Sequence, residues 1–315
     1  MSSATALVFP GMGPSNFSEV GKFMVLDPYT RRRLQEADEA LGYRLLDRFY
    51  ASDSDYSEYT QLAFLVNSIA LADRAVETLG MRPEICVGPS FGQKAAAVYA
   101  ETMSFSDALR MTAETARCEA EFFATEYTDT VTQSVARTPR AQLEELVAEL
   151  NDRGELCEIS GYMDSTFFLV TLRGSALDGF TAAVRAMNGH PMYTMRPPVH
   201  ARAFAALRDK AEREVFSRYR IDDPALTVVA DQDGRIVDTA DAVRTMLLDT
   251  FDRPVDWPAA VDALRGLGVE HVVVTGPDNL FRRLACTTSH FQVTAFDPKS
   301  TVRRMTAPVT TPAGA

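Results

Sequence analysis

The stretch Ile85-Cys86-Val87-Gly88-Pro89-Ser90-Phe91-Gly92-Gln93 joins a short apolar run to a Gly-x-Ser-x-Gly turn, and the helix-favouring segment 94–100 follows it. This order predicts a strand, a tight turn and a helix, with Ser90 at the tip of the turn. Gly88 and Gly92 lack side chains, so the strand and the helix can approach closely on either side of Ser90. A serine held in this way lies near the unpaired N–H groups of a helix start, which stabilise an oxyanion. Ser90 is therefore a candidate nucleophile, and the alternative is an ordinary turn with a surface serine.

Composition limits the class of protein. A chain of 315 residues with 46% hydrophobic and 24% charged residues is globular and can form one large domain or two. The net charge of -11 disfavours nucleic acid as a general partner. The 4 cysteines stand at unrelated spacings, so we expect no disulfide, no metal site and a cytoplasmic location. No basic and apolar leader and no bilayer-length stretch is visible, so we expect neither export nor a membrane partner.

Around the turn, the chain alternates between buried strands and amphipathic helices. Residues 4–13 predict a strand that continues into a glycine-rich loop, and helices are expected over 22–41, 60–79 and 105–127. This alternation is typical of a three-layer α/β fold with a mainly parallel sheet. We therefore expect an α/β-hydrolase-like large domain.

The middle of the chain has a different pattern. Strands are expected over 129–136, 155–161, 166–172 and 190–196, and helices over 140–150 and 176–187. This βαββαβ order is the ferredoxin-like signature of a small inserted domain. The large-domain pattern resumes with a long helix over 203–219, and the segment 306–315 looks disordered. The expected division is 1–127 for the first part of the large domain, 128–197 for the small domain and 198–315 for the second part of the large domain.

The chain has 4 histidines that could activate Ser90. His200 follows Arg-Pro-Pro-Val at 196–199, where the small domain is expected to return to the large one. Clefts form between domains, so this junction is a favourable place for a catalytic base. His190, His271 and His290 fit structural or solvated roles better, and a structural role is also the alternative for His200.

Several sequence blocks stand in a fixed order along the chain. They are Phe-Pro-Gly-Met-Gly at 9–13, Thr-Gln at 60–61, Gly-Pro-Ser-Phe-Gly-Gln at 88–93, Val-His at 199–200, Pro-Val-Asp-Trp at 254–257 and a strand within 268–277. In these blocks the chain resembles the malonyl-CoA:acyl carrier protein transacylase family, the acyltransferases of fatty acid and polyketide synthesis. The ordered set is far more specific than any single block.

The resemblance implies a Ser-His dyad that transfers acyl groups by a ping-pong mechanism. His200 would take the proton of Ser90, and the acyl group would rest on the serine as an ester until a second thiol collects it. The backbone N–H groups of Met12 and Phe91 would form the oxyanion hole, and the backbone carbonyl of Arg253 would orient His200. No metal is implied, and no cofactor beyond the phosphopantetheine arm of the partner carrier.

Departures from the family pattern concern the substrate. Malonyl-specific members carry an arginine at the position of Thr115, and such an arginine is the bidentate partner of a malonate carboxylate. Larger side chains replace small polar ones in the segment that lines the family's acyl pocket. The expected substrate-binding residues are Gln61, Gln93, Thr115, Tyr162, Met163, Phe167 and Phe168. Together they favour a larger acyl group without a free carboxylate, and the alternative is that the aromatic residues fill the small-domain core.

A subset of the family, the stand-alone acyltransferases of macrolactam polyketide pathways of the VinK type, resembles this description. It implies transfer of an aminoacyl or dipeptidyl β-amino acyl group between a donor and an acceptor acyl carrier protein, with acyl-CoA as an alternative donor. Carrier proteins are acidic, so Arg153, Arg202 and Lys299 are the expected docking residues. The remaining alternatives are a malonyl- or acyl-CoA transacylase, an editing thioester hydrolase, an unrelated esterase and a catalytically inactive binding module.

Overall fold

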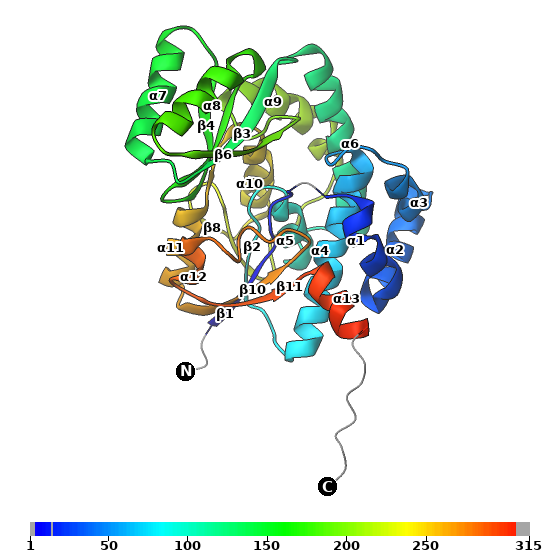
Figure 1. The fold of residues 1–315 in the computed structure, drawn as a ribbon. Helices are drawn as coiled ribbons and strands as arrows, with labels where there is room; N and C mark the ends of the chain where they lie inside the picture. The colour runs from blue at the N-terminus through cyan, green and yellow to red at the C-terminus, as the bar shows by residue number, and fades with distance from the viewer. Residues whose placement is uncertain (1–3, 14, 307–315) are drawn as a thin grey trace.

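The structure is a computed structural model that describes residues 4–13 and 15–306 (Figure 1). The tail that was expected to be disordered lies outside this range from residue 307 on. The strands of the described residues form two sheets. They are β1 (Ala4–Val8), β2 (Ile85–Val87), β3 (Thr130–Ala136), β4 (Cys157–Asp164), β5 (Phe167–Arg173), β6 (His190–Met195), β7 (Thr227–Val229), β8 (Ile236–Val237), β9 (Val255–Asp256), β10 (Val269–Thr275) and β11 (Gln292–Phe296).

The larger sheet has the order β11-β10-β1-β2-β7-β8. Its strands pair in parallel, except that β8 is antiparallel to β7. Successive side chains of a strand point to opposite faces. Leu7 and Phe9 accordingly pack into one hydrophobic cluster, while Ala6 and Val8 pack into another. Both faces are covered, which confirms the expected three-layer α/β fold.

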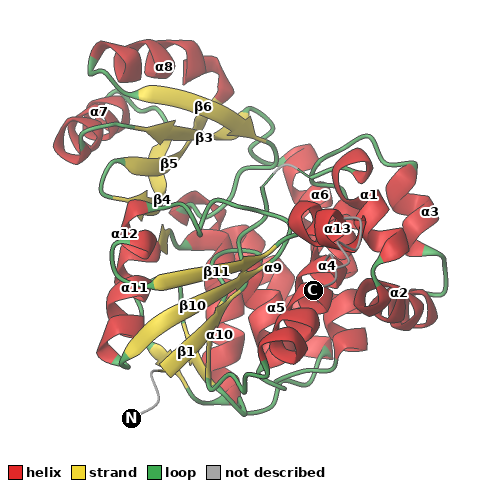
Figure 2. Cartoon of the chain, turned by 60° about the horizontal axis from the view of Figure 1, so that its bottom comes forward, coloured by secondary structure: helices red, strands yellow, loops and turns green. Residues whose placement is uncertain are grey.

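Helices cover the two faces of this sheet unequally. Most of them, including α4, α5 and α6, belong to the Leu7 side, and α11 covers the Ala6 side (Figures 1 and 2). The helices are α1 (Phe17–Leu26), α2 (Pro28–Leu41), α3 (Leu45–Tyr50), α4 (Glu58–Leu79), α5 (Gly92–Tyr99), α6 (Phe105–Thr125), α7 (Arg140–Asp152), α8 (Leu177–Ala186), α9 (Ala205–Glu214), α10 (Ala240–Asp252), α11 (Trp257–Gly266), α12 (Ala285–Thr288) and α13 (Pro298–Thr306).

Two of the long helices expected from the sequence are interrupted. The expectation of one helix over 22–41 was wrong, because Asp27 ends α1 and begins α2. Its side chain accepts a hydrogen bond of 2.9 Å from the Thr30 N–H, and Pro28 occupies the first turn of α2. Proline has no N–H to continue a preceding helix. The helix expected over 203–219 is α9 alone, flanked by short 3₁₀ turns.

The smaller sheet has the order β6-β3-β5-β4-β9, with α7 and α8 packed beside it. Its first and third strands, β3 and β5, lie in the centre and pair antiparallel with their neighbours. This arrangement confirms the ferredoxin-like fold. The short β9, from the second part of the chain, adds to the sheet in parallel, with Val255 opposite Gly161. The division at 128–197 stays a proposal, and β9 ties the small sheet to the rest of the chain.

The small sheet lies at one end of the molecule, away from the large sheet (Figure 2). Ser90 lies just beyond β2 of the large sheet, and His200 lies on the segment that returns from β6. The two parts of the fold thus bring distant segments of the chain together. In the described part of the chain, no helix combines the length and hydropathy needed to cross a bilayer.

Candidate active site

The turn between β2 and α5 holds Ser90 in a strained conformation. Ser90 has φ +54°, in the left-handed region that residues with a Cβ rarely adopt. A Cβ at Gly88 would collide with the backbone of Gly92, and one at Gly92 would collide with the carbonyl of Phe9. Both glycines are therefore required for the close approach of strand, turn and helix. The left-handed conformation costs about 1–2 kcal/mol, so the surrounding contacts must hold it.

His200 is the partner of Ser90. Its Nε2 lies 2.7 Å from the Ser90 Oγ, and its side chain is buried. His200 also has a positive φ, +60°. Burial lowers the pKa of His200 to about 4, although the backbone carbonyls of Arg253 and Thr250 act in the opposite direction. The ring is therefore neutral at pH 7 and can accept a proton from Ser90.

The other ring nitrogen, Nδ1, faces the end of α10. The carbonyls of Arg253 and Thr250 lie near enough to raise the pKa of His200, but Nδ1 makes no hydrogen bond of normal geometry to a described residue. A proton on Nδ1 leaves Nε2 free to accept from Ser90. The placement of Arg253 thus agrees with the orienting role that was expected for its carbonyl.

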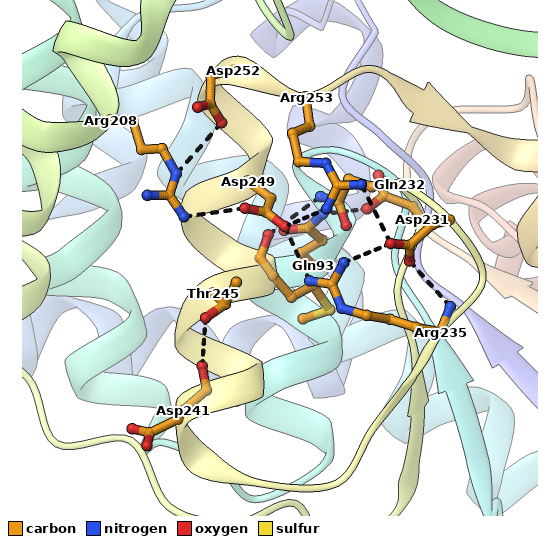
Figure 3. A network of polar contacts seen from close by, with 12 residues as sticks. Gln93, Arg208, Asp231, Gln232, Arg235, Asp241, Thr245, Asp249, Asp252 and Arg253 are labelled. Atoms are coloured by element: carbon orange, nitrogen blue, oxygen red, sulfur yellow. Dashed lines mark hydrogen bonds and ion pairs between the residues drawn. The ribbon is translucent and has the colours of Figure 1, made fainter. Parts of the chain in front are cut away.

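A cluster of charged side chains stabilises the C-terminal end of α10. Arg208, Arg235 and Arg253 converge on the buried carboxylate of Asp249, at 3.1, 3.0 and 3.0 Å (Figure 3). Charge-assisted hydrogen bonds of this kind are the strong ones, and they are screened little when buried. The cluster holds the last turn of α10, and with it the carbonyls that face His200. Sequence reasoning missed it, because its members are far apart in the chain.

Asp231 is a second residue that the sequence analysis missed. Its fully buried carboxylate accepts a hydrogen bond of 2.6 Å from the Ser90 N–H and another from the Gln93 side-chain amide. Burial raises the pKa of Asp231 to about 7, against the opposing effect of these two donors. Asp231 follows β7, the strand next to β2, and its hydrogen bonds hold the turn that carries Ser90. The sequence predicts only a buried strand just before it, over 226–230, which the structure shows as β7.

A largely apolar cavity opens beside Ser90 and His200. Its volume is about 130 Å³, and its walls include the loops that follow β1 and β2 of the large sheet and residues of β4, β5 and β6 of the small sheet. The sequence-predicted residues that line it are Ser90, His200, Met12, Phe91, Gln61, Gln93 and Met163. Phe91 is the N-cap residue of α5, so its N–H has no partner within the helix and is free for an oxyanion. The cavity thus brings together the candidate nucleophile, the candidate base and a candidate oxyanion donor.

Four expected substrate-binding residues do not line this cavity: Thr115, Tyr162, Phe167 and Phe168. Phe168 is buried in the core of the small domain, where Tyr162 packs against it with ring centroids 5.9 Å apart. Phe167 packs at the edge of the cluster that contains Met163. Thr115 is fully buried, and on α6 it precedes the cavity-lining Glu119 by one turn. This cavity does not meet the expectation that these residues line the pocket: alternation along β5 directs the Phe168 ring into the small-domain core, with Tyr162 packed on it, and Thr115 is enclosed on α6.

The three expected docking residues lie outside the cavity. Their side chains are 70%, 86% and 64% exposed for Arg153, Arg202 and Lys299. Each forms a surface ion pair with a nearby glutamate, and such exposed pairs are weak enough to exchange partners.

The depressed pKa of His200 leads to a testable pH dependence. Protonated His200 cannot accept the Ser90 proton, so acyl-enzyme formation should decline only as the pH falls toward about 4. Single-turnover acylation followed by mass spectrometry across pH measures this. Asp231 also titrates in the range, so the Asp231→Asn variant is measured in parallel. A midpoint at 6.5, the ordinary value for histidine, in both proteins would contradict the assignment.

A strained serine on a strand-turn-helix, a neutral histidine in contact with it and an apolar cavity together form the arrangement that is typical of α/β enzymes that attack acyl groups through serine. Comparisons with known proteins narrow this class. Residues 134–195 match the family model described as the VinK acyltransferase small domain. The malonyl CoA-acyl carrier protein transacylase of Escherichia coli K12 is 24% identical over 286 residues, which cover 89% of this chain and 91% of that protein. The corresponding protein of Salmonella typhimurium is 26% identical over 284 residues, with the same coverage.

Solved structures share the fold. FabD from Acinetobacter baumannii matches with a TM-score of 0.82 at 21% identity, over 97% of this chain and 98% of that one. A malonyl-transacylase solved in complex with its type II polyketide synthase acyl-carrier protein matches with a TM-score of 0.83 at 21% identity, over 96% and 98% of the chains. The resemblance seen in the sequence is confirmed: the chain is similar to malonyl-CoA:acyl carrier protein transacylases over most of its length, and its residues 134–195 match the VinK small domain.

Proposed function

We propose that this protein transfers a non-malonyl acyl group, an aminoacyl or dipeptidyl β-amino acyl group, between acyl carrier proteins in macrolactam polyketide biosynthesis. The observation that carries the proposal is the contact of 2.7 Å between the Ser90 Oγ and the His200 Nε2 in the wall of a largely apolar cavity. The match of residues 134–195 to the VinK small domain supports the choice of substrate class.

The first half-reaction forms an acyl-serine. The Ser90 Oγ attacks the thioester carbonyl while His200 Nε2 takes its proton, and the N–H groups of Met12 and Phe91 stabilise the oxyanion. The C–S bond then breaks, and the imidazolium returns the proton to the departing thiol of the phosphopantetheine arm. The apolar cavity favours this sequence, because it leaves few water molecules to compete.

The second half-reaction runs in reverse with a new carrier. The incoming thiol gives its proton to His200 and attacks the acyl-serine ester, and Ser90 leaves with the proton that His200 returns. No cofactor is needed in this scheme, since the carrier brings its own phosphopantetheine arm. The same residues therefore serve both directions of transfer.

Malonyl transfer is the second candidate. The relatives named above are malonyl transacylases, and Lys94 supplies a cation to the cavity although position 115 does not. Hydrolysis of misacylated carriers is a third candidate, since it needs the same dyad. Intact-protein mass spectrometry with a panel of malonyl, alkanoyl and aminoacyl carriers separates the three. Transfer of the aminoacyl group to a second carrier, without matching acid release, is the result that supports the proposal.

The acidic carrier predicts a role for Arg153, Arg202 and Lys299. Reversal of each charge to glutamate should lower transfer to a carrier protein by about two- to tenfold, because long-range attraction speeds encounter. Transfer to a small pantetheine thiol should change little, because that thiol carries no acidic surface. The effect should shrink with added salt, since exposed charges are screened beyond about 8 Å at physiological ionic strength.

Arg220→Glu is the matched control, because Arg220 is 85% exposed and is not among the docking residues. It should leave both reactions unchanged. Equal slowing of the carrier and the pantetheine reactions by all three reversals would place those residues in the channel or in folding, and would overturn the docking assignment.

A further inference from the structure

Two opposite charges line the wall of the cavity beside Ser90. Lys94 belongs to the first turn of α5, and Glu119 belongs to α6. Lys94 is 7% exposed, and its Nζ lies 4.5 Å from the centre of the Phe91 ring, directly after the nucleophile. The neighbouring wall is apolar, with Phe123, Phe204 and Phe216 among its residues.

These two charges lie close enough to attract each other but form no ion pair. Within the described residues, neither Lys94 nor Glu119 forms a salt bridge of 4.0 Å or less, to the other or elsewhere. Burial lowers the pKa of Lys94 and raises that of Glu119, while the attraction between them opposes both shifts. The Gln61 amide also lowers the pKa of the Glu119 carboxyl. Lys94 is a buried charge with no hydrogen-bond partner among the described residues, which is costly, and Glu119 has only the Gln61 amide nearby, so a polar group between Lys94 and Glu119 is favoured.

The chemistry of that group follows from the two charges. A carboxylate would pair with Lys94 but be repelled by Glu119. An ammonium would pair with Glu119 but be repelled by Lys94. An alkyl chain would offer a hydrogen bond to neither charge. A secondary amide carries an acceptor and a donor a short distance apart, and it adds no charge. Among common acyl substituents, a secondary amide can therefore hydrogen-bond to Lys94 and Glu119 at the same time.

We propose that Lys94 and Glu119 are specificity-determining residues that read a secondary amide within the acyl chain, whose carbonyl accepts from Lys94 Nζ and whose N–H donates to the Glu119 carboxylate. This inference rests on the proposed function, since it concerns the acyl group carried by Ser90. It separates amide-containing chains from free amines, carboxylates and alkyl chains of equal length.

The test uses pantetheine thioesters of matched chain length. N-acetyl-β-alanyl, 3-acetoxypropanoyl and hexanoyl groups place an amide, an ester and a methylene pair at the same positions, and malonyl and β-alanyl groups supply a carboxylate and a free amine. The unaltered enzyme should acylate with the amide at a kcat/KM about ten- to a hundredfold above the others, the range expected for hydrogen bonds to charged groups. Acyl-serine formation is measured by mass spectrometry.

Variants assign the preference to the two residues. Glu119→Gln and Lys94→Met should each reduce the preference for amide over hexanoyl by about tenfold or more, and Glu119→Gln should leave the ester, which has no N–H, nearly unchanged. Glu121→Gln and Lys22→Met are the matched controls, because both residues are exposed outside the cavity, and they should keep the wild-type preference.

Two failures are distinguishable. Absence of an acyl-serine with every thioester would overturn the proposed function itself. Efficient acylation with equal use of amide, ester and hexanoyl groups, or a preference for malonyl, would leave acyl transfer intact and overturn the amide inference. The comparison within the unaltered enzyme decides this even if a variant fails to fold.

Discussion

Ser90→Ala is expected to abolish the acyl-enzyme adduct completely, because among the described residues that line the cavity only Ser90 has a side-chain hydroxyl hydrogen-bonded to His200. His200→Ala is expected to keep a slow reaction, reduced on the order of a thousandfold, since the oxyanion donors and the cavity remain. Intact-protein mass spectrometry detects the adduct, and single-turnover kinetics measures the rate of acylation.

Two exposed residues provide controls of the same kinds. Ser165→Ala and His290→Ala alter side chains on the surface and should leave acylation unchanged. An adduct of normal mass that survives in Ser90→Ala would show that another residue carries the acyl group. A rate in His200→Ala within a few-fold of the unaltered enzyme would remove His200 from its role as base.

The second large effect is expected at Asp231, which positions the nucleophile turn without touching the acyl group. Asp231→Ala would leave the Ser90 N–H and the Gln93 amide buried without their acceptor. We expect a loss of about 2–4 kcal/mol in the free energy of unfolding, from two unsatisfied buried donors. Acylation should slow as well, because the left-handed conformation of Ser90 loses its anchor. Thermal unfolding and single-turnover acylation measure the two effects.

Asp231→Asn is the conservative comparison. Its amide oxygen can still accept from the Ser90 N–H, and its amide group can donate to Gln93 Oε1, which is buried and has no partner among the described residues. Stability should therefore be largely retained. An Asp231→Asn variant as unstable as Asp231→Ala would mean that the negative charge, and not the hydrogen bonding, holds the turn.

The same pair of proteins tests the raised pKa of Asp231. A carboxyl whose pKa is raised from 3.8 to about 7 by burial stabilises the fold below 3.8 and loses this contribution as the pH rises through 7. The unaltered protein should therefore lose stability relative to Asp231→Asn between about pH 4 and 7, and the difference should level off above pH 7. Parallel stability curves in this range would contradict the assignment.

Much of the fold could be predicted from local patterns. Alternating apolar residues and short turns are sufficient to indicate the βαββαβ unit and the strand-turn-helix at Ser90, because each depends on neighbours in sequence. The break at Asp27-Pro28 was also encoded locally, as an N-cap residue followed by proline, but the apolar pattern of the two helices obscured it. The pairing of β9 with β4 was not predictable in this way, since it joins segments about 90 residues apart.

The residues of the candidate site also differ in whether the sequence or the tertiary structure identifies them. The sequence by itself determined the nucleophile turn, since Gly88, Ser90 and Gly92 create it wherever a strand precedes and a helix follows. Family resemblance supplied His200, which contacts a serine 110 positions away. Only the tertiary structure decided which side chains surround that pair: it directed Phe168 into the small-domain core and brought Asp231 beneath Ser90 across 141 positions. It also placed Lys94 and Glu119 in the wall of the same cavity. The physical reason is that strand and helix patterns depend on near neighbours, whereas the burial and partners of a charge depend on every segment that packs around it.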